Sequence, residues 1–340
     1  MTSHMLAEAL EAPASVARLL AHDDITYASL GALWRNKPPR NVLTVARGSS
    51  DHAAHYMAYL AMARLGEIVT SLPMSIVTLH AAQMRRAGLA CVAFSQSGQS
   101  PDLVAPTRYL RDGGACTVAV VNDAESPLAQ AAQWLLPLHA GTERSVAATK
   151  SYIAQLVAGA RLVAHWQGDA ALRGAISRLP DTLALAAQQD WSAALPVLTQ
   201  ADRLYVVGRG TGLAVAMEAA LKLKEVCGLQ AEAYSGAELR HGPMALVEAG
   251  YPLLVLAPRG PAQAGLLALA DELRRHGARV LLAAPVGTPN SELPLVNTTD
   301  EDLDPISVVQ SFYPMVEALA RARGADPDKP RHLTKVTRTN

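Results

Sequence analysis

The sequence has 340 residues, of which 50% are hydrophobic and 18% charged, and its 30 Lys and Arg balance 30 Asp and Glu. This length predicts about two domains, and the apolar content excludes a disordered chain. Zero net charge and the lack of any apolar run near ~18 residues argue against a nucleic-acid or membrane partner. The N-terminus also lacks the basic start of a secretory signal, so we expect a globular, cytoplasmic protein.

Short β-branched runs alternate with longer Ala- and Leu-rich stretches of helical spacing along the whole chain. Because the short runs are apolar on both faces, they predict buried parallel strands in an α/β fold. The predicted strands are Val42–Ala46, Leu89–Phe94, Cys116–Val121, Leu204–Gly208, Pro252–Ala257 and Arg279–Ala284.

The chain also repeats itself. VLTVARGSS (Val42–Ser50) and LYVVGRGTG (Leu204–Gly212) share a strand, an Arg-Gly turn and a small polar residue that opens a helix. Arg47 and Arg209 are 162 residues apart (209 − 47), a period too long for a solenoid and typical of a duplicated domain. We predict an N-terminal helical segment (1–40), a first domain (41–168), a helical linker (169–200), a second domain (201–325) and a C-terminal tail (326–340).

The loop Ser95–Ser100 (SQSGQS) follows a predicted strand and precedes a helix whose first residue is predicted to be Pro101, with Ser100 as its N-cap. Free backbone N–H groups at a helix N-terminus, together with three serine hydroxyls, are typical of a phosphate site. An ordinary capped turn is the alternative. The corresponding stretch of the second copy, Ala257–Ala262, has no hydroxyl, which favours the phosphate site.

One Gly-containing turn follows the first strand of each copy. Gly48 permits close backbone approach, and Ser49 and Ser50 could hold sugar hydroxyls or the same phosphate; a plain strand–helix connection is the alternative. The turn Gly208–Gly212 resembles the start of a dinucleotide fingerprint. Its third glycine is replaced by Leu213, so we expect no nucleotide cofactor.

Glu218, Lys222 and Glu225 are spaced to share one face of an otherwise apolar helix. They form either a solvated Glu–Lys pair or a carboxylate and an ammonium that project into a site, where partial burial suits proton transfer. His241 lies beside a Gly-Pro break. Histidine is a residue type suited to proton transfer near neutral pH, although most single histidines are structural or exposed.

Other polar groups carry weaker signals. His52 and His55 beside Asp51 have no convincing further ligand, so we expect no metal. The cysteines have apolar neighbours and are expected to be core thiols; they are Cys91, Cys116 and Cys227. The tail is either a loose, charged terminus or a docked segment, in which Leu333 and Val336 would place Lys335 in a cleft.

Four long motifs resemble the double sugar-isomerase (SIS) domain family, and the likeness runs from about residue 6 to the end. The motifs are SQSGQSPD (Ser95–Asp102), AGTERSVAATKSY (Ala140–Tyr152), ALKLKEVCGLQAEAYSGAELRHGP (Ala220–Pro243) and DPDKPRHLTKVT (Asp326–Thr337). The chain is similar to the isomerase half of glucosamine-fructose-6-phosphate aminotransferases and, more closely, to SIS-type glucosamine-6-phosphate deaminases. The resemblance implies two tandem flavodoxin-like domains in a homodimer, with the active site near the dimer interface.

The resemblance also implies roles for individual residues. Glu225 would move a proton between sugar carbons 1 and 2, and His241, supplied by the partner subunit, would open the ring. Lys335 would close the site and meet the open-chain carbonyl, assisted by Lys222. The substrate would contact Gly48, Ser49, Ser50, Ser95, Gln96, Ser97, Ser100, Val146 and Ala148, with the four residues of the 95–100 loop on the phosphate.

Two departures from the aminotransferase pattern favour the deaminase. The chain begins at the isomerase region with no glutaminase domain or N-terminal cysteine nucleophile, and Ala148 stands where the synthases usually carry serine. We therefore expect conversion of glucosamine-6-phosphate to fructose-6-phosphate and ammonia without a cofactor. The alternatives are aminotransferase-like synthesis, isomerisation of another sugar phosphate, and a non-catalytic sugar-phosphate sensor.

Overall fold

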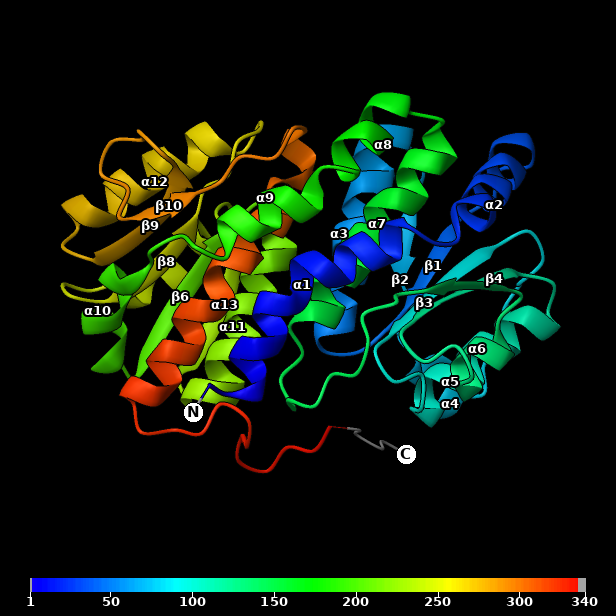
Figure 1. The fold of residues 1–340 in the computed structure, drawn as a ribbon, viewed down its shortest axis with the longest axis horizontal. Helices are drawn as coiled ribbons and strands as arrows, with labels where there is room; N and C mark the ends of the chain where they lie inside the picture. The colour runs from blue at the N-terminus through cyan, green and yellow to red at the C-terminus, as the bar shows by residue number, and fades with distance from the viewer. Residues whose placement is uncertain (1, 336–340) are drawn as a thin grey trace. The chain divides into compact units, whose positions relative to one another are not determined.

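The computed structural model describes residues 2–335, and these form two compact units (Figure 1). Unit 1 comprises residues up to Pro13, Arg144–Thr149 and Arg178–Leu333; unit 2 comprises Ala14–Glu143, Lys150–Ser177 and the tail from Thr334. Within the described residues each unit contains a five-stranded, fully parallel sheet with helices on both faces. The predicted α/β class is confirmed.

The sheet of unit 2 has the strand order β2-β1-β3-β4-β5, the flavodoxin-like order. Its strands are β1 (Val42–Val45), β2 (Val69–Ser71), β3 (Ala90–Ser95), β4 (Cys116–Val121) and β5 (Trp134–Pro137). Its helices are α2 (Asp24–Asn36), α3 (Ser49–Leu65), α4 (Ser75–Thr78), α5 (Pro101–Asp112), α6 (Pro127–Ala131), α7 (Lys150–Gln167) and α8 (Ala170–Ile176). Helix α1 (His4–Leu20) contributes residues to both units.

Unit 1 repeats this order as β7-β6-β8-β9-β10. Its strands are β6 (Arg203–Gly208), β7 (Gln230–Ser235), β8 (Pro252–Leu256), β9 (Arg279–Pro285) and β10 (Leu293–Leu295). Its α-helices are α9 (Leu179–Ala186), α10 (Leu195–Thr199), α11 (Thr211–Cys227), α12 (Gln263–Arg275) and α13 (Asp304–Ala322). Short 3₁₀ turns are η1 (Ser192–Ala194), η2 (Glu238–Arg240), η3 (Pro243–Leu246) and η4 (Glu301–Leu303).

The duplication predicted from the sequence is present in the local geometry. Helix α11 has the bounds of α3 shifted by 162 residues at each end (211 − 49 and 227 − 65). The N-cap glycines Gly48 and Gly210 have φ of 54° and 64°, and the C-cap glycines Gly66 and Gly228 are both left-handed. Because residues with a side chain rarely adopt these backbone angles, glycine recurs at the same positions in both copies.

Helices cover both faces of each sheet. In unit 2, α3 packs on α7 and α5 packs on α4 and α6; in unit 1, α11 packs on α13 and α12 covers β8 and β9 (Figure 1). The core of each unit lies between its sheet and these helices, as with Leu253 and Val255 of β8 against Leu269 and Leu273 of α12. Burial on both faces explains why the predicted central strands are uniformly apolar.

The six predicted strands all form, with bounds that differ by at most one residue at either end. Four further strands, β2, β5, β7 and β10, escaped prediction because each is short or carries partly exposed positions. Across residues 2–335, no helix is long and apolar enough to cross a membrane. The tail residue Val336 lies outside the described residues.

Candidate functional site

Two loops meet at the switch point of the unit 2 sheet, where ligands bind in this class of fold. The strands β1 and β3 are neighbours in the sheet. After β1 the chain continues to β2 on one side of this pair, and after β3 it continues to β4 on the other side. Arg47–Ser50 follows the carboxyl end of β1, and Gln96–Ser100 follows that of β3. The fold therefore places the two predicted loops, one for the sugar and one for the phosphate, at adjacent strand ends.

The 95–100 loop is shaped by its own serines. The Gly98 N–H donates to Ser95 Oγ at 2.9 Å, and the Gln99 N–H donates to Ser97 Oγ at 3.3 Å. A hydroxyl oxygen that accepts a bond keeps its proton for donation, so both serines can still donate to an anion. Ser100 is the N-cap of α5 and Pro101 its first residue, as predicted, but the Ser100 side chain does not cap the helix.

Neighbouring segments hold this loop firmly in place. The Gly98 carbonyl accepts a bond from the Leu128 N–H of α6, and the Gln96 carbonyl accepts one from the Asn122 N–H. Gly98 has φ of 64°, and a Cβ there would lie 2.1 Å from Ser126 Oγ. Because that distance is far below van der Waals contact, only glycine fits the loop at this position.

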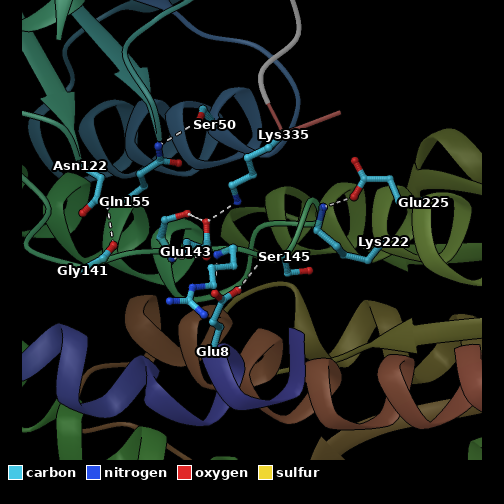
Figure 2. Close-up of polar contacts among 12 residues, drawn as sticks. Glu8, Ser50, Asn122, Gly141, Glu143, Ser145, Gln155, Lys222, Glu225 and Lys335 are labelled. Carbon is cyan, nitrogen blue, oxygen red and sulfur yellow. Dashed lines mark hydrogen bonds and ion pairs between the residues drawn. The ribbon is translucent and has the colours of Figure 1, made fainter. Parts of the chain in front are cut away.

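The β1 loop combines an open approach with a positive charge. A Cβ at Gly48 would meet nothing within 4 Å, so the backbone is accessible there, and Arg47 Nε lies 3.1 Å from Asp102 Oδ2 in the first turn of α5. Ser49 is partly exposed at the start of α3, whereas Ser50 is buried and accepts a 2.9 Å bond from Gln155 Nε2 of α7. The Ser50 hydroxyl thus anchors α3 to α7 (Figure 2).

A buried carboxylate in unit 2 receives the tail lysine. Glu143 Oε2 accepts bonds from Ser151 Oγ at 2.6 Å and from Lys335 Nζ at 3.1 Å, and the Ser151 N–H donates to Oε1 (Figure 2). The Glu143 side chain is fully buried, and that of Lys335 is 26% exposed. Glu143 was not predicted. Its single letter in the AGTERSVAATKSY motif gave no spacing signal, because its partners lie 8 and 192 residues away.

In unit 1, helix α11 presents the three predicted charged residues as one contact cluster. Lys222 Nζ contacts Glu225 Oε2 and lies 3.3 Å from Glu218 Oε1 (Figure 2 shows the Lys222–Glu225 pair). The side chains of Glu218 and Lys222 are 0% and 1% exposed, whereas that of Glu225 is 20% exposed. A solvated Glu–Lys pair is therefore ruled out, and Glu225 is the carboxylate of the cluster that solvent reaches.

The electrostatics of this cluster keep the lysine charged. Burial by itself lowers the pKa of Lys222, but the adjacent Glu218 and Glu225 outweigh it, and the pKa is raised above its ordinary value. Lys222 is thus an ammonium at neutral pH. Glu225 also lines a cavity of about 960 Å³ within unit 1, together with Lys224, Arg323 and residues of the 325–333 segment.

The remaining predicted residues are His241, Val146 and Ala148. His241 is exposed at the end of η2, outside the Glu218–Lys222–Glu225 contacts. Val146 and Ala148 are partly buried in the 144–149 segment of unit 1, where the buried Glu8 carboxylate accepts bonds from the N–H groups of Arg144 and Ser145. Glu8 is a second carboxylate that the sequence gave no reason to select.

Burial shifts the pKa of two cysteines and of His55. Cys91 and Cys227 are buried, and burial raises the pKa of each to about 12, so they are core thiols as predicted. Cys116, the third predicted core thiol, is only partly buried. Burial lowers the pKa of His55 on α3. Among residues 2–335, no group of three His, Cys, Asp or Glu side chains is placed to hold a metal ion.

Comparison with known proteins identifies the family of this chain. The SIS domain model matches residues 37–164 and 197–318, and the chain belongs to the SIS domain family. A solved structure from Silicibacter pomeroyi DSS-3, provisionally named a phosphosugar isomerase, is 44% identical, with a TM-score of 0.91 over 96% of this chain and 100% of that one.

Two further relatives carry more specific names. The glutamine–fructose-6-phosphate aminotransferase (isomerizing) of Aeropyrum pernix is 34% identical over 98% of this chain and 56% of its own length. The chain thus spans about half the length of the curated relatives it matches. The glucosamine-6-phosphate deaminase of Thermotoga maritima is 23% identical with a TM-score of 0.77 over 99% of this chain, which shows a shared fold.

Proposed function

We propose that this chain converts glucosamine-6-phosphate and water to fructose-6-phosphate and ammonia. The observation that carries the proposal is the buried Glu218–Lys222–Glu225 cluster, in which one carboxylate remains partly exposed. Proton transfer between adjacent carbons needs a carboxylate that is accessible to the substrate. Glu225 is the accessible carboxylate of the cluster, and Lys222 contacts it from the buried side.

In this mechanism His241 opens the sugar ring to give the aldehyde at carbon 1. Glu225 removes the proton from carbon 2 and returns it to carbon 1, while the aldehyde oxygen gains a proton and the amino nitrogen loses one. Carbon 1 thus becomes CH2OH, and the carbon–nitrogen bond at carbon 2 becomes an imine. Water then adds to carbon 2 and ammonia leaves, which gives the ketone of fructose-6-phosphate. Lys222 balances the charge of Glu225 while the proton moves, and Lys335 faces the open-chain carbonyl.

The phosphate is assigned to the 95–100 loop of unit 2. The hydroxyls of Ser95, Ser97 and Ser100, the α5 N-terminus and the positive charge of Arg47 are the types of group that bind phosphate monoesters. Gln96 is partly exposed in the same loop, and the accessible Gly48 and Ser49 are assigned to the sugar. The bond from Gln155 gives Ser50 an anchoring role in addition to any sugar contact.

The test is a parallel assay of both products from purified protein and glucosamine-6-phosphate. Formation of ammonia and fructose-6-phosphate in a 1:1 ratio without glutamine supports the deaminase. Absence of both products overturns it. Glu225→Gln should bind substrate but lose turnover, while Glu248→Gln, an exposed surface residue of the same unit, should behave as wild type. Wild-type turnover by Glu225→Gln would remove Glu225 from the mechanism.

A second candidate is the reverse direction, amination of fructose-6-phosphate, as in the aminotransferases named above. The observation that favours it is the 34% identity to the Aeropyrum pernix aminotransferase over nearly the whole chain. Incubation with fructose-6-phosphate and either ammonium or glutamine separates the two directions. Synthesis from ammonium that exceeds deamination under matched conditions would favour the second candidate.

A further inference from the structure

We propose that Tyr313 is a positioning residue for the proton transfer described above, acting on Glu225 through Glu218 and Lys222. This inference rests on the proposed function, since it concerns the same carboxylate. Tyr313 lies on α13, which packs against α11, and its side chain is completely buried. Its hydroxyl donates to Glu218 Oε1 at 3.3 Å.

The hydroxyl and the ammonium share one oxygen atom. Lys222 Nζ also lies 3.3 Å from Glu218 Oε1, while it contacts Glu225 on its other side. One positive charge is thus divided between two carboxylates, of which one is fully buried. A hydrogen bond from a neutral donor stabilises the Glu218 carboxylate without adding charge, so less of the Lys222 charge is drawn toward it. Lys222 is then held toward Glu225.

A purely structural role for Tyr313 makes a different prediction. Most buried phenols have an acceptor, and in a structural role Glu218 would only satisfy the Tyr313 hydroxyl. In that case loss of the hydroxyl would lower stability but leave the titration of the carboxylates unchanged. If Tyr313 positions Lys222, its loss should weaken the hold on Glu225 and move the titration of that carboxylate to higher pH.

The test compares Tyr313→Phe with Tyr27→Phe. Tyr27 is a matched control, because it is also fully buried and its hydroxyl has no hydrogen-bond partner among the described residues. We expect Tyr313→Phe to keep KM for glucosamine-6-phosphate within about twofold and to lose about tenfold in kcat, the size of one buried hydrogen bond. The acid limb of its kcat profile should move to higher pH, and Tyr27→Phe should match wild type in both.

A double variant separates positioning from packing. If Tyr313 acts through Glu218, then in a Glu218→Gln background the further change Tyr313→Phe should have almost no effect on kcat. Losses that multiply would overturn the proposal. So would a Tyr313→Phe variant with wild-type kcat and an unmoved pH profile.

A measurement without substrate distinguishes failure of this proposal from failure of the proposed function. Glutamate residues labelled with ¹³C at the carboxyl carbon report their own titration by NMR, and Glu225→Gln identifies the signal of Glu225. An upward shift of that titration in Tyr313→Phe supports the proposal whatever reaction the protein catalyses, and an unshifted titration overturns it. A wild-type protein that releases no ammonia from glucosamine-6-phosphate overturns only the proposed function.

Discussion

Replacement of Lys222 by methionine should strongly destabilise the protein, because it removes the positive charge that two carboxylates share. Lys222 and Glu218 are almost completely buried, so the substitution leaves the Glu218 carboxylate without its counter-charge. Loss of one partner of a buried ion pair costs about 3–5 kcal/mol, a large part of the ~5–15 kcal/mol that typically stabilises a protein. With an unfolding entropy of about 2.1 cal/mol/K per residue over 340 residues, this corresponds to a fall in Tm of about 4–7 °C.

The pH dependence provides a second check on the same variant. Burial lowers the pKa of Lys222, but the two carboxylates raise it by more than burial lowers it. The pKa of Lys222 is therefore above its ordinary value of 10.5. The stabilisation is therefore present below pH 10.5 and lost only as the pH rises through the raised pKa. In the Lys222→Met variant, Glu218 has lost its counter-charge. As the pH falls toward about 4, protonation of Glu218 should reduce the difference in unfolding free energy between the variant and the wild type.

Calorimetry between pH 4 and pH 8 measures both effects. Lys224→Met is the control, because this lysine is exposed on the same helix, and its substitution should change stability by less than about 0.5 kcal/mol. Adding Glu218→Gln to Lys222→Met should recover much of the lost stability. Equal Tm values for Lys222→Met and Lys224→Met, or a loss of stability that does not change with pH, would show that the Lys222 charge does not stabilise the buried carboxylate.

Three further predictions concern unit 2. Ser97→Ala and Ser100→Ala should each raise KM for the sugar phosphate by about 10- to 100-fold with little change in kcat, because each removes one hydrogen bond to a charged group. Steady-state kinetics and competition by inorganic phosphate measure the loss of affinity. Gly98→Ala should lower Tm and raise KM together, because its Cβ has no room. Glu143→Gln should release Lys335 and speed proteolytic cleavage of the tail, which mass spectrometry follows; an unchanged cleavage rate would contradict the role of that ion pair.

The parallel strands and the duplication could be predicted because both leave local marks in the sequence. A strand buried on both faces is recognised as a short apolar run. A left-handed helix C-cap favours glycine, so Gly66 and Gly228, 162 residues apart (228 − 66), mark the same C-cap conformation in the two copies. Strand β7 (QAEAYS) escaped because it lies at a sheet edge and is partly exposed, which allows polar side chains.

The candidate site was predictable where one short segment carries it. The 95–100 loop and the i, i+4 and i+7 spacing on α11 are local patterns, and the structure forms both. Glu143, Glu8 and Tyr313 could not be selected, because each acts through a partner between 8 and 192 residues away. The inward turn of Ser50 toward Gln155 was equally invisible, since helix packing alone determines it.

The two copies differ at the position of Ser97, and the difference explains why a single site is proposed. Arg259 of unit 1 corresponds to Ser97 of unit 2 at the 162-residue offset (259 − 97). Its guanidinium donates to both carboxylate oxygens of Asp304, at 2.8 and 2.9 Å, and to the Thr298 carbonyl. These bonds raise the pKa of Arg259, so the pair stays ionised. At this position unit 1 holds an arginine paired with an internal carboxylate, where unit 2 has a serine hydroxyl, so we propose the phosphate site for unit 2 alone.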